Sequence, residues 1–246
     1  MQTNTSNPQS LAPRPAIKYV AEVSPVKEVM LLGLADLAFW KERLAAENLT
    51  PLAQGGQAQL FISATEARFH GIRFRECIIG VHVQRVNAQP DDLPAMFLLH
   101  AWNSLRAFAW IERTLFGTPY YPGQIEVNPK QPAQMGVGER GKALIAATMQ
   151  PREPAQMVEE NWHGAIFLPR RGNKPQQMFV AKLAGTTEHY PHEITRDHLA
   201  LLYSPSCPAL GWLTDSQFRP IAWHIRQTAK HAKSKTYRAD QFFQSR

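Results

Sequence analysis

Apolar and polar residues alternate along much of this chain, a pattern typical of β-strands. Two long runs, residues 57–69 and 73–86, predict consecutive antiparallel strands joined at a His-Gly-Ile turn. Further strands are expected at residues 95–102, 124–128, 142–150, 164–168, 178–183 and 199–203. Three- and four-residue spacing of apolar positions predicts helices at residues 34–48 and 103–116. The pattern therefore indicates a mainly β (α+β) fold with a few flanking helices.

Composition supports one domain. A hydrophobic content of 44% is enough to build a core, and 19 prolines suit a β protein with many loops. Residues 1–16 are rich in Gln, Asn, Ser, Thr and Pro, which predicts a disordered leader and not a signal peptide. No apolar run reaches the roughly 18 residues that span a bilayer. Cys77 and Cys207 alone give no disulfide framework, so we expect a cytoplasmic protein without a membrane role.

Charge is concentrated near the C-terminus. Residues 219–246 contain seven Lys or Arg and one acid, whereas the rest of the chain has 20 Lys or Arg and 19 acids. We therefore interpret residues 17–218 as a single, nearly neutral domain and residues 219–246 as a basic C-terminal helix or tail. Nucleic-acid binding is a hypothesis for the tail alone, and no nucleic-acid fold motif accompanies the charge, so a solvated helix is the favoured interpretation.

The helix predicted at residues 103–116 ends in a rigid turn. Asn103 is its predicted N-cap, Gly117 its C-terminal stop, and Pro119 prevents its continuation. Two tyrosines, Tyr120 and Tyr121, follow the proline and lead into an alternating strand. The turn therefore places two phenol side chains at the edge of a predicted sheet.

This segment resembles the acetoacetate decarboxylase superfamily. There, a short helix holding an Arg leads through a Gly-x-Pro turn to a Lys-Lys pair, and the first Lys forms a Schiff base with a keto acid. This chain keeps Arg113, Gly117 and Pro119, as well as Phe116, and has tyrosines in place of both lysines. A phenol cannot form an imine, so the resemblance is nearest to an uncharacterised branch, a domain family of unknown function, that lacks the Schiff-base lysine.

A second segment, residues 73–83, is similar to the superfamily strand that places a Glu in the cavity. The resemblance extends from about residue 20 to about residue 215. It implies an acetoacetate decarboxylase-like fold, an antiparallel β barrel or cone that encloses a small-molecule cavity.

Glu76 is the first candidate site residue. By period two it shares a strand face with Phe74 and Ile78, so its carboxylate points toward an apolar interior. A carboxylate in such a place pairs with a cation or has a raised pKa. The alternative is that Cys77 and its own period-two neighbours form the core face, which would leave Glu76 as a surface charge.

Three further residues complete the candidate site. Arg113 lies on the helix that faces the turn and is a candidate clamp for a substrate carboxylate, although an Arg on a helix surface is commonly just solvated. Tyr120 or Tyr121 is a candidate hydrogen-bond donor to a developing enolate, and the alternative is an aromatic wall. Adjacent extended residues point to opposite faces, so we expect at most one tyrosine in the cavity.

Other groups are weaker candidates. Lys142 and Lys182 lie in predicted strands and could supply an amine from elsewhere, but strand lysines mostly face water. The run Glu188-His189-Tyr190-Pro191-His192-Glu193 has ligand-type residues without a recognised metal-binding spacing. His82 and His100 lie on strands and are interpreted as structural groups. We expect no cofactor and no metal.

The leading functional hypothesis is an enzyme, lyase- or isomerase-like, that acts on a keto or carboxylated metabolite by acid-base catalysis without a Schiff base. One alternative is a non-catalytic binding or sensing protein with the same cavity. Another is an adaptor for nucleic acid or an acidic partner through the basic tail. The expected partner is a small anionic or carbonyl-containing molecule, and a homo-oligomer is compatible with the sequence.

Overall fold

The computed structural model describes residues 16–244. The predicted leader, residues 1–16, lies outside the described residues except for Ala16. Most of the described chain forms strands joined by loops and a few short helices, which confirms the predicted mainly β fold. Within residues 16–244, no helix is both long and apolar enough to cross a membrane.

Two sheets contain all the strands named here. The larger, ten-stranded sheet contains β1 (Tyr19–Asp36), β2 (Leu49–Pro51), β3 (Ala53–Gln54), β4 (Gln57–Phe69), β5 (Ile72–Arg85), β6 (Ala95–Asn103), β7 (Tyr120–Pro122), β11 (Gln156–Phe167), β12 (Gln177–Pro191) and β14 (Arg219–Arg238). The four-stranded sheet contains β8 (Gln124–Asn128), β9 (Ala133–Glu139), β10 (Lys142–Met149) and β13 (His198–Leu201). The helices are α1 (Leu37–Ala45), α2 (Arg106–Ile111), the π-helical turn η1 (Glu112–Phe116), α3 (Pro208–Asp215) and α4 (Ala239–Gln244).

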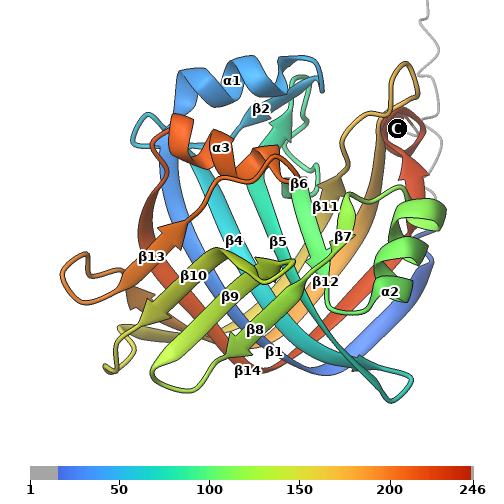
Figure 1. Cartoon of the computed structure of the whole chain (residues 1–246). Coiled ribbons are helices and arrows are strands. Elements are labelled where there is room, and N and C mark those ends of the chain that lie inside the picture. Colours follow the sequence, from blue (N-terminus) through green and yellow to red (C-terminus); the bar gives the residue numbers. More distant parts are fainter. Residues whose placement is uncertain (1–15, 245–246) are drawn as a thin grey trace, which may run out of the picture.

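The larger sheet closes on itself into a ring. Its strands pair in the order β5, β4, β1, β14, β12, β11 and β6, and β6 pairs again with β5 (Figure 1). All pairings in this ring are antiparallel except that of β6 with β11. The short strand β7 also adds to β6 in parallel. The predicted antiparallel arrangement is therefore correct for the ring apart from one pair.

The smaller sheet covers the outside of the ring, where β8 packs against β1, β4 and β5 (Figure 1). Cys77, Ile79 and Val81 of β5 are buried in the core that also contains residues of β9 and β10. Burying one Val or Ile side chain stabilises the fold by about 1.5–3 kcal/mol, so this outer face fixes the register of β5. The alternate residues, including Glu76, consequently point into the ring.

The helix predicted at residues 34–48 is shorter than expected. Leu34 and Ala35 pair with β4 as part of β1, so the helix begins only at Leu37. The Asp36 carboxylate accepts a hydrogen bond of 2.6 Å from the backbone N–H of Phe39 and caps the helix. Local periodicity alone could not show that the strand continues to residue 36.

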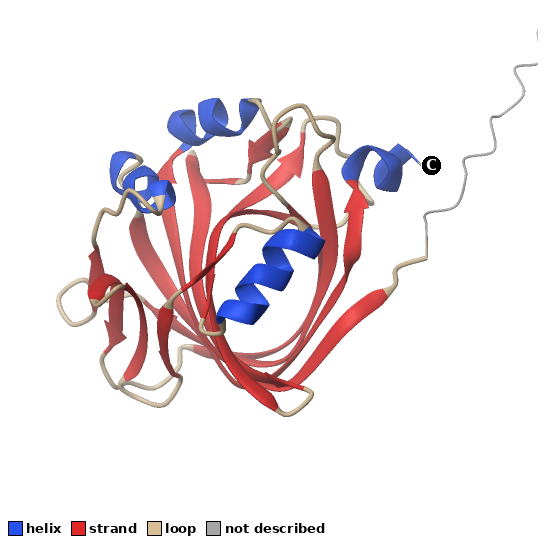
Figure 2. Cartoon of the chain, turned by 45° about the vertical axis from the view of Figure 1, so that its right-hand side comes forward, coloured by secondary structure: helices blue, strands red, loops and turns tan. Residues whose placement is uncertain are grey.

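The helix predicted at residues 103–116 begins at Arg106, because Asn103 is the last residue of β6 and does not cap the helix. It continues through η1 and ends at Gly117, whose φ of 72° is the left-handed conformation that glycine adopts at little cost. The predicted stop is confirmed. Figure 2 shows the helix formed by α2 and η1 lying across one opening of the ring.

The predicted basic helix or tail at residues 219–246 is wrong for most of its length. Residues 219–238 form β14, which pairs with β1 on one side and β12 on the other. Only Ala239–Gln244 are helical. The alternation of buried Trp223 and Ile225 with polar neighbours is a strand pattern, and the charge count concealed it. No free basic tail exists among residues 219–244, so the adaptor hypothesis loses its structural basis.

Asp197, just before β13, ties the two sheets together. Its carboxylate accepts hydrogen bonds of 2.8 and 2.6 Å from Arg152 and one of 3.0 Å from the indole of Trp223. Burial alone would raise the pKa of Asp197, but the Arg152 guanidinium and backbone N–H donors outweigh it and hold the pKa well below its usual range. This carboxylate therefore stabilises the fold as an anion.

Candidate active site inside the strand ring

The ring encloses a cavity of about 880 Å³. The inner faces of the strands form its walls, and the helix across the opening contributes Phe108, Ile111 and Leu115. Most of the lining side chains are apolar, and the polar ones come from most strands of the ring and from η1. A cavity of this size accommodates a small organic molecule.

Glu76 lies on the inner face of β5 and lines this cavity. One of its carboxylate oxygens accepts a hydrogen bond of 3.0 Å from the Tyr120 hydroxyl, and the other accepts one of 2.9 Å from the Asn103 amide. Each carboxylate oxygen has two lone pairs, so each can still accept one further hydrogen bond from a ligand in the cavity. The carboxyl group is therefore oriented by two donors and still accessible to a ligand.

The protein environment shifts the proton affinity of Glu76. Removal from bulk solvent has the largest effect, and the nearby Glu112 carboxylate adds repulsion. The Lys233 ammonium and the hydrogen bonds from Tyr120 and Asn103 act in the opposite direction. The net result raises the pKa of Glu76 from 4.5 to about 7. At neutral pH this carboxyl can therefore either take or give a proton.

Tyr120 reaches the cavity because of the turn that precedes it. After Gly117, strand β7 pairs in parallel with β6, which places Tyr120 opposite Ala101 and leaves its side chain 7% exposed. Burial, reinforced by the adjacent Glu76 and Glu112 carboxyls, raises the pKa of Tyr120 well above 10. Its hydroxyl consequently stays neutral and acts as a hydrogen-bond donor.

A lysine and a second carboxylate complete this end of the cavity. The Lys233 ammonium of β14 forms an ion pair with Glu112 of η1, and each side chain is 18% exposed. The Thr118 hydroxyl donates a 2.9 Å hydrogen bond to the same Glu112 oxygen. The ammonium also lies 4.7 Å from the ring centroids of Phe116 and Phe179. A cation held in this way provides a fixed positive charge beside Glu76.

The other two predicted site residues lie elsewhere. Tyr121 stacks on His100 with ring centroids 4.8 Å apart, and the Arg113 guanidinium lies 5.4 Å from the Tyr121 ring. Neither Arg113 nor Tyr121 lines the cavity. The predicted anion clamp at Arg113 is therefore not part of this site, and only one of the two tyrosines enters it, as the alternation of a strand requires.

The lysines considered from the sequence are not placed like Lys233. Lys142 is exposed on β10 in the outer sheet. Lys182 lines the cavity, but its side chain is exposed and its ammonium lies 4.6 Å from the ring centroid of Tyr19. His82 also lines the cavity, and burial lowers its pKa to about 4, so it is neutral there.

Sequence reasoning missed Lys233, Glu112 and Asn103 as members of the site. Lys233 belongs to the basic segment that its charge predicts to be a solvated helix or tail. The strand pattern of residues 220–226 is the signal that would place it in the sheet. Glu112 and Asn103 were treated as helix residues. Their contacts join segments up to 121 positions apart, and local periodicity carries no information on such pairs.

Comparison with known proteins identifies the fold. No family model matches this sequence, and no curated protein matches it. The structure is similar to that of acetoacetate decarboxylase from Legionella pneumophila, with a TM-score of 0.62 and 12% identity over 96% of this chain and 98% of that one.

Two other structures are also similar. The enduracididine biosynthesis enzyme MppR, complexed with pyruvate, gives a TM-score of 0.60 at 10% identity over 92% of this chain and 91% of that one. An acetoacetate decarboxylase-like enzyme from Sphingomonas wittichii gives 0.54 at 12% identity over 96% and 98%. The chain therefore has the acetoacetate decarboxylase-like fold that its turn and its Glu-containing strand predict.

Proposed function

We propose that this protein is an enzyme that transfers a proton at a carbon next to the carbonyl group of a small keto or carboxylated metabolite. The observation that carries the proposal is the arrangement of Glu76, whose pKa is about 7, between the neutral donor Tyr120 and the ammonium of Lys233 on the cavity wall. Perturbed carboxyls that lie in a cavity with positioned donors are concentrated at catalytic sites.

In the proposed reaction, the Glu76 carboxylate removes a proton from the carbon beside the carbonyl group. The electron pair of the broken C–H bond moves into the carbonyl group and leaves an enolate oxygen. The Lys233 ammonium stabilises that negative charge, and Tyr120 donates to the Glu76 carboxylate or to the enolate. Delivery of the proton by Glu76 to a different carbon of a conjugated enolate gives an isomerase-type outcome, whereas its return to the same carbon gives exchange alone.

A lyase-type outcome uses the same groups. Cleavage of the bond between the α-carbon and a carboxylate carbon releases CO₂ and leaves the electron pair of that bond in the enolate. Protonated Glu76 then supplies the proton that replaces the carboxylate. Both outcomes pass through one enolate and need no imine. Lys233 is engaged as an ammonium with Glu112, and an ammonium has no lone pair for attack on a carbonyl carbon.

The cavity suggests the shape of the substrate. Its volume of about 880 Å³ exceeds what a three-carbon keto acid fills, and apolar side chains such as Leu98, Ile166 and Phe179 surround the polar end. We infer a substrate with a carbonyl or carboxylate group at Glu76 and Lys233 and an aliphatic or aromatic body beyond it. The pyruvate complex of the structurally similar MppR supports a carbonyl acid as the ligand class.

Proton exchange in D₂O tests the proposal directly. The full-length protein is incubated with a panel of short and long-chain keto acids, and loss of the α-proton signal is followed by NMR. We expect exchange for at least one member and a loss of about 100-fold or more in Glu76→Gln, because general acid-base catalysis contributes that much. Tyr121→Phe, a phenol outside the cavity, is the matched control and should exchange like the wild type.

Two results would contradict the mechanism. Exchange that persists unchanged in Glu76→Gln would remove the carboxyl from the reaction. A borohydride-stable adduct on Lys233, found by mass spectrometry after incubation with the reacting keto acid, would replace the enolate route with an imine route. Saturable binding without any exchange would favour the non-catalytic binding protein.

A further inference from the structure

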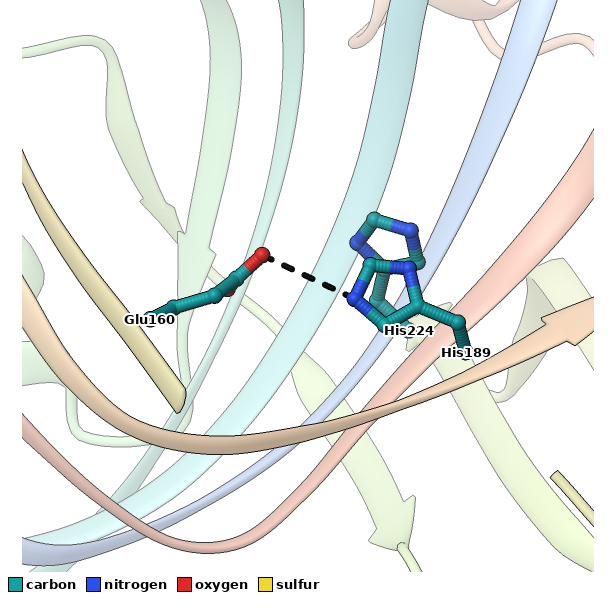
Figure 3. Close-up of side chains that lie close together, drawn as sticks. All are labelled: Glu160, His189 and His224. Atoms are coloured by element: carbon teal, nitrogen blue, oxygen red, sulfur yellow. Dashed lines mark ion pairs between the residues drawn. The ribbon is translucent and has the colours of Figure 1, made fainter. Parts of the chain in front are cut away.

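A second polar group lies on three neighbouring strands of the ring and does not include Glu76 or Lys233. Glu160 of β11, His189 of β12 and His224 of β14 each place one ligand-type atom within 4.8 Å of the other two (Figure 3). His189 and His224 are cross-strand partners, and their ring centroids are 3.9 Å apart. Glu160 approaches them from the next strand, with an oxygen 3.8 Å from Nε2 of His189.

The unused atoms in this group are electron-pair donors. Nε2 of His189 is buried and has no hydrogen-bond partner among residues 16–244. The Glu160 oxygen nearest to it, Oε1, is not the one that Arg226 and Thr187 occupy. The imidazole ring of His224, the cross-strand partner of His189, offers a further nitrogen to the same group. Nitrogen and oxygen lone pairs that converge in this way suit a cation.

The surrounding contacts hold the Glu160 carboxylate in place. Arg226 donates to its Oε2 atom, and the Thr187 hydroxyl donates to the same atom at 2.7 Å. Arg226 is itself fixed by hydrogen bonds of 2.8 Å to Glu28 and to Thr187. Partners that orient a carboxylate while leaving its second oxygen free are typical of the outer shell of metal sites.

The charge of the group also favours a cation. Two carboxylates, Glu28 and Glu160, face one guanidinium, that of Arg226, and the His231 imidazole lies 3.5 Å from Glu28, so the carboxylates outnumber the permanent cations by one. The guanidinium already has both carboxylates as partners. Excess negative charge would therefore repel an anion at this position. A divalent cation would instead be attracted and coordinated by the free nitrogen and oxygen atoms.

We propose that Glu160, His189 and His224 bind a divalent first-row transition-metal ion of the class represented by Zn²⁺. Two imidazole nitrogens and one carboxylate oxygen are a donor set of catalytic zinc sites, which keep a fourth position open. Glu160 and His224 line the cavity, so that fourth position faces the same interior as Glu76. The site does not depend on the proposed proton transfer.

The three ligand atoms, which lie within 4.8 Å of one another, must move closer together to hold a metal ion. Metal–ligand distances of about 2.0–2.1 Å in a tetrahedral site separate the ligand atoms by about 3.3 Å. The Glu160 oxygen and the His189 nitrogen, now 3.8 Å apart, must therefore approach by about half an ångström. The His189 side chain is 26% exposed, which leaves its imidazole room to turn toward the oriented Glu160 carboxylate.

Metal titration of the tag-free, full-length protein tests the proposal. After treatment with a chelator, the protein is titrated with Zn²⁺ by calorimetry and with Co²⁺ by visible absorption. We expect one equivalent of each ion and the intense absorption of four-coordinate Co²⁺. His189→Gln and His224→Gln should each weaken binding by more than about tenfold, because ligand loss exceeds the cost of losing an outer-shell partner.

The control is His198→Gln, the same change at an exposed position on β13, which should bind like the wild type. Glu160→Gln preserves the shape of the side chain and serves if a histidine variant does not fold. Failure of the wild type to bind either ion in a defined ratio would overturn the proposal. Wild-type affinity in folded His189→Gln or Glu160→Gln would overturn it as well.

Discussion

Replacing Glu76 with Gln should make the protein more stable at high pH while removing its proton-transfer group. The pKa of this carboxyl is about 7 in the folded protein and 4.5 in the unfolded chain. Because the folded state binds the proton more tightly, the unfolded state gains stability from ionisation first as pH rises. The free energy of unfolding therefore falls between about pH 4.5 and about pH 7 and then levels off.

The size of the effect follows from the two pKa values. Multiplying their difference by about 1.36 kcal/mol per pKa unit gives about 3 kcal/mol of stability lost by the wild type above neutral pH. Gln has the shape of the protonated carboxyl and cannot ionise, so the variant avoids this loss. The Gln amide has a donor where the carboxyl has an acceptor for Tyr120 or Asn103, and this mismatch reduces the gain in the free energy of unfolding by about 1 kcal/mol. We expect a net gain of about 2 kcal/mol at about pH 8.5.

Urea denaturation of both proteins across the range from about pH 5 to about pH 8.5 measures the difference. The variant's advantage should be small at the acidic end and grow as pH rises. Tyr121→Phe leaves the cavity intact and should follow the wild-type profile. A difference that stays constant with pH, or a variant that is less stable than the wild type at the alkaline end, would refute the assignment of a raised pKa to Glu76.

Three further predictions concern groups around the site and the fold. Lys233→Met removes the cation that lowers the pKa of Glu76, so the acidic limb of a proton-exchange pH profile should move to higher pH. Asp197→Asn breaks a bidentate ion pair and should cost about 3 kcal/mol in urea denaturation at neutral pH, with the difference shrinking as pH falls below 3.8. Gly117→Ala places a Cβ at a φ of +72° and 2.6 Å from the Gln177 Oε1 atom, which should lower stability by about 1–2 kcal/mol in the same assay and weaken exchange by displacing Tyr120.

The inward placement of Glu76 could be predicted because it depends on period two and on an apolar outer face, both of which are local properties. The positions of β4 and β8 were predicted from sequence with their observed bounds. No strand was predicted at the position of β1, and β12 extends beyond its predicted bounds of 178–183. A strand extends as far as its neighbours offer hydrogen bonds, and those neighbours are distant in sequence.

The partners of Glu76 were harder to predict for the same reason. The turn before Tyr120 predicts that one of the two tyrosines enters the cavity. Which of them does so depends on which face of β7 points into the ring. Arg113 was assigned from a family pattern, and the helix turns it toward Tyr121 instead. In the sequence, Lys233 is one of several charges near the C-terminus. Only the pairing of β14 with β1 and β12 shows that its side chain points into the cavity.

The place of β14 has a consequence for how the molecule is made. Among the described strands, β14 is the last along the sequence, and it lies between β1, the first, and β12, so the ring cannot close before residues 219–238 have left the ribosome. Until then both neighbouring strands expose unpaired edges, which invite association with other chains. Lys233, Arg226 and His224 all belong to this strand, so a chain that has not yet added it holds Glu76 and Tyr120 without the neighbouring ammonium. The enclosed cavity can therefore form only after β14 has paired with both of its neighbours.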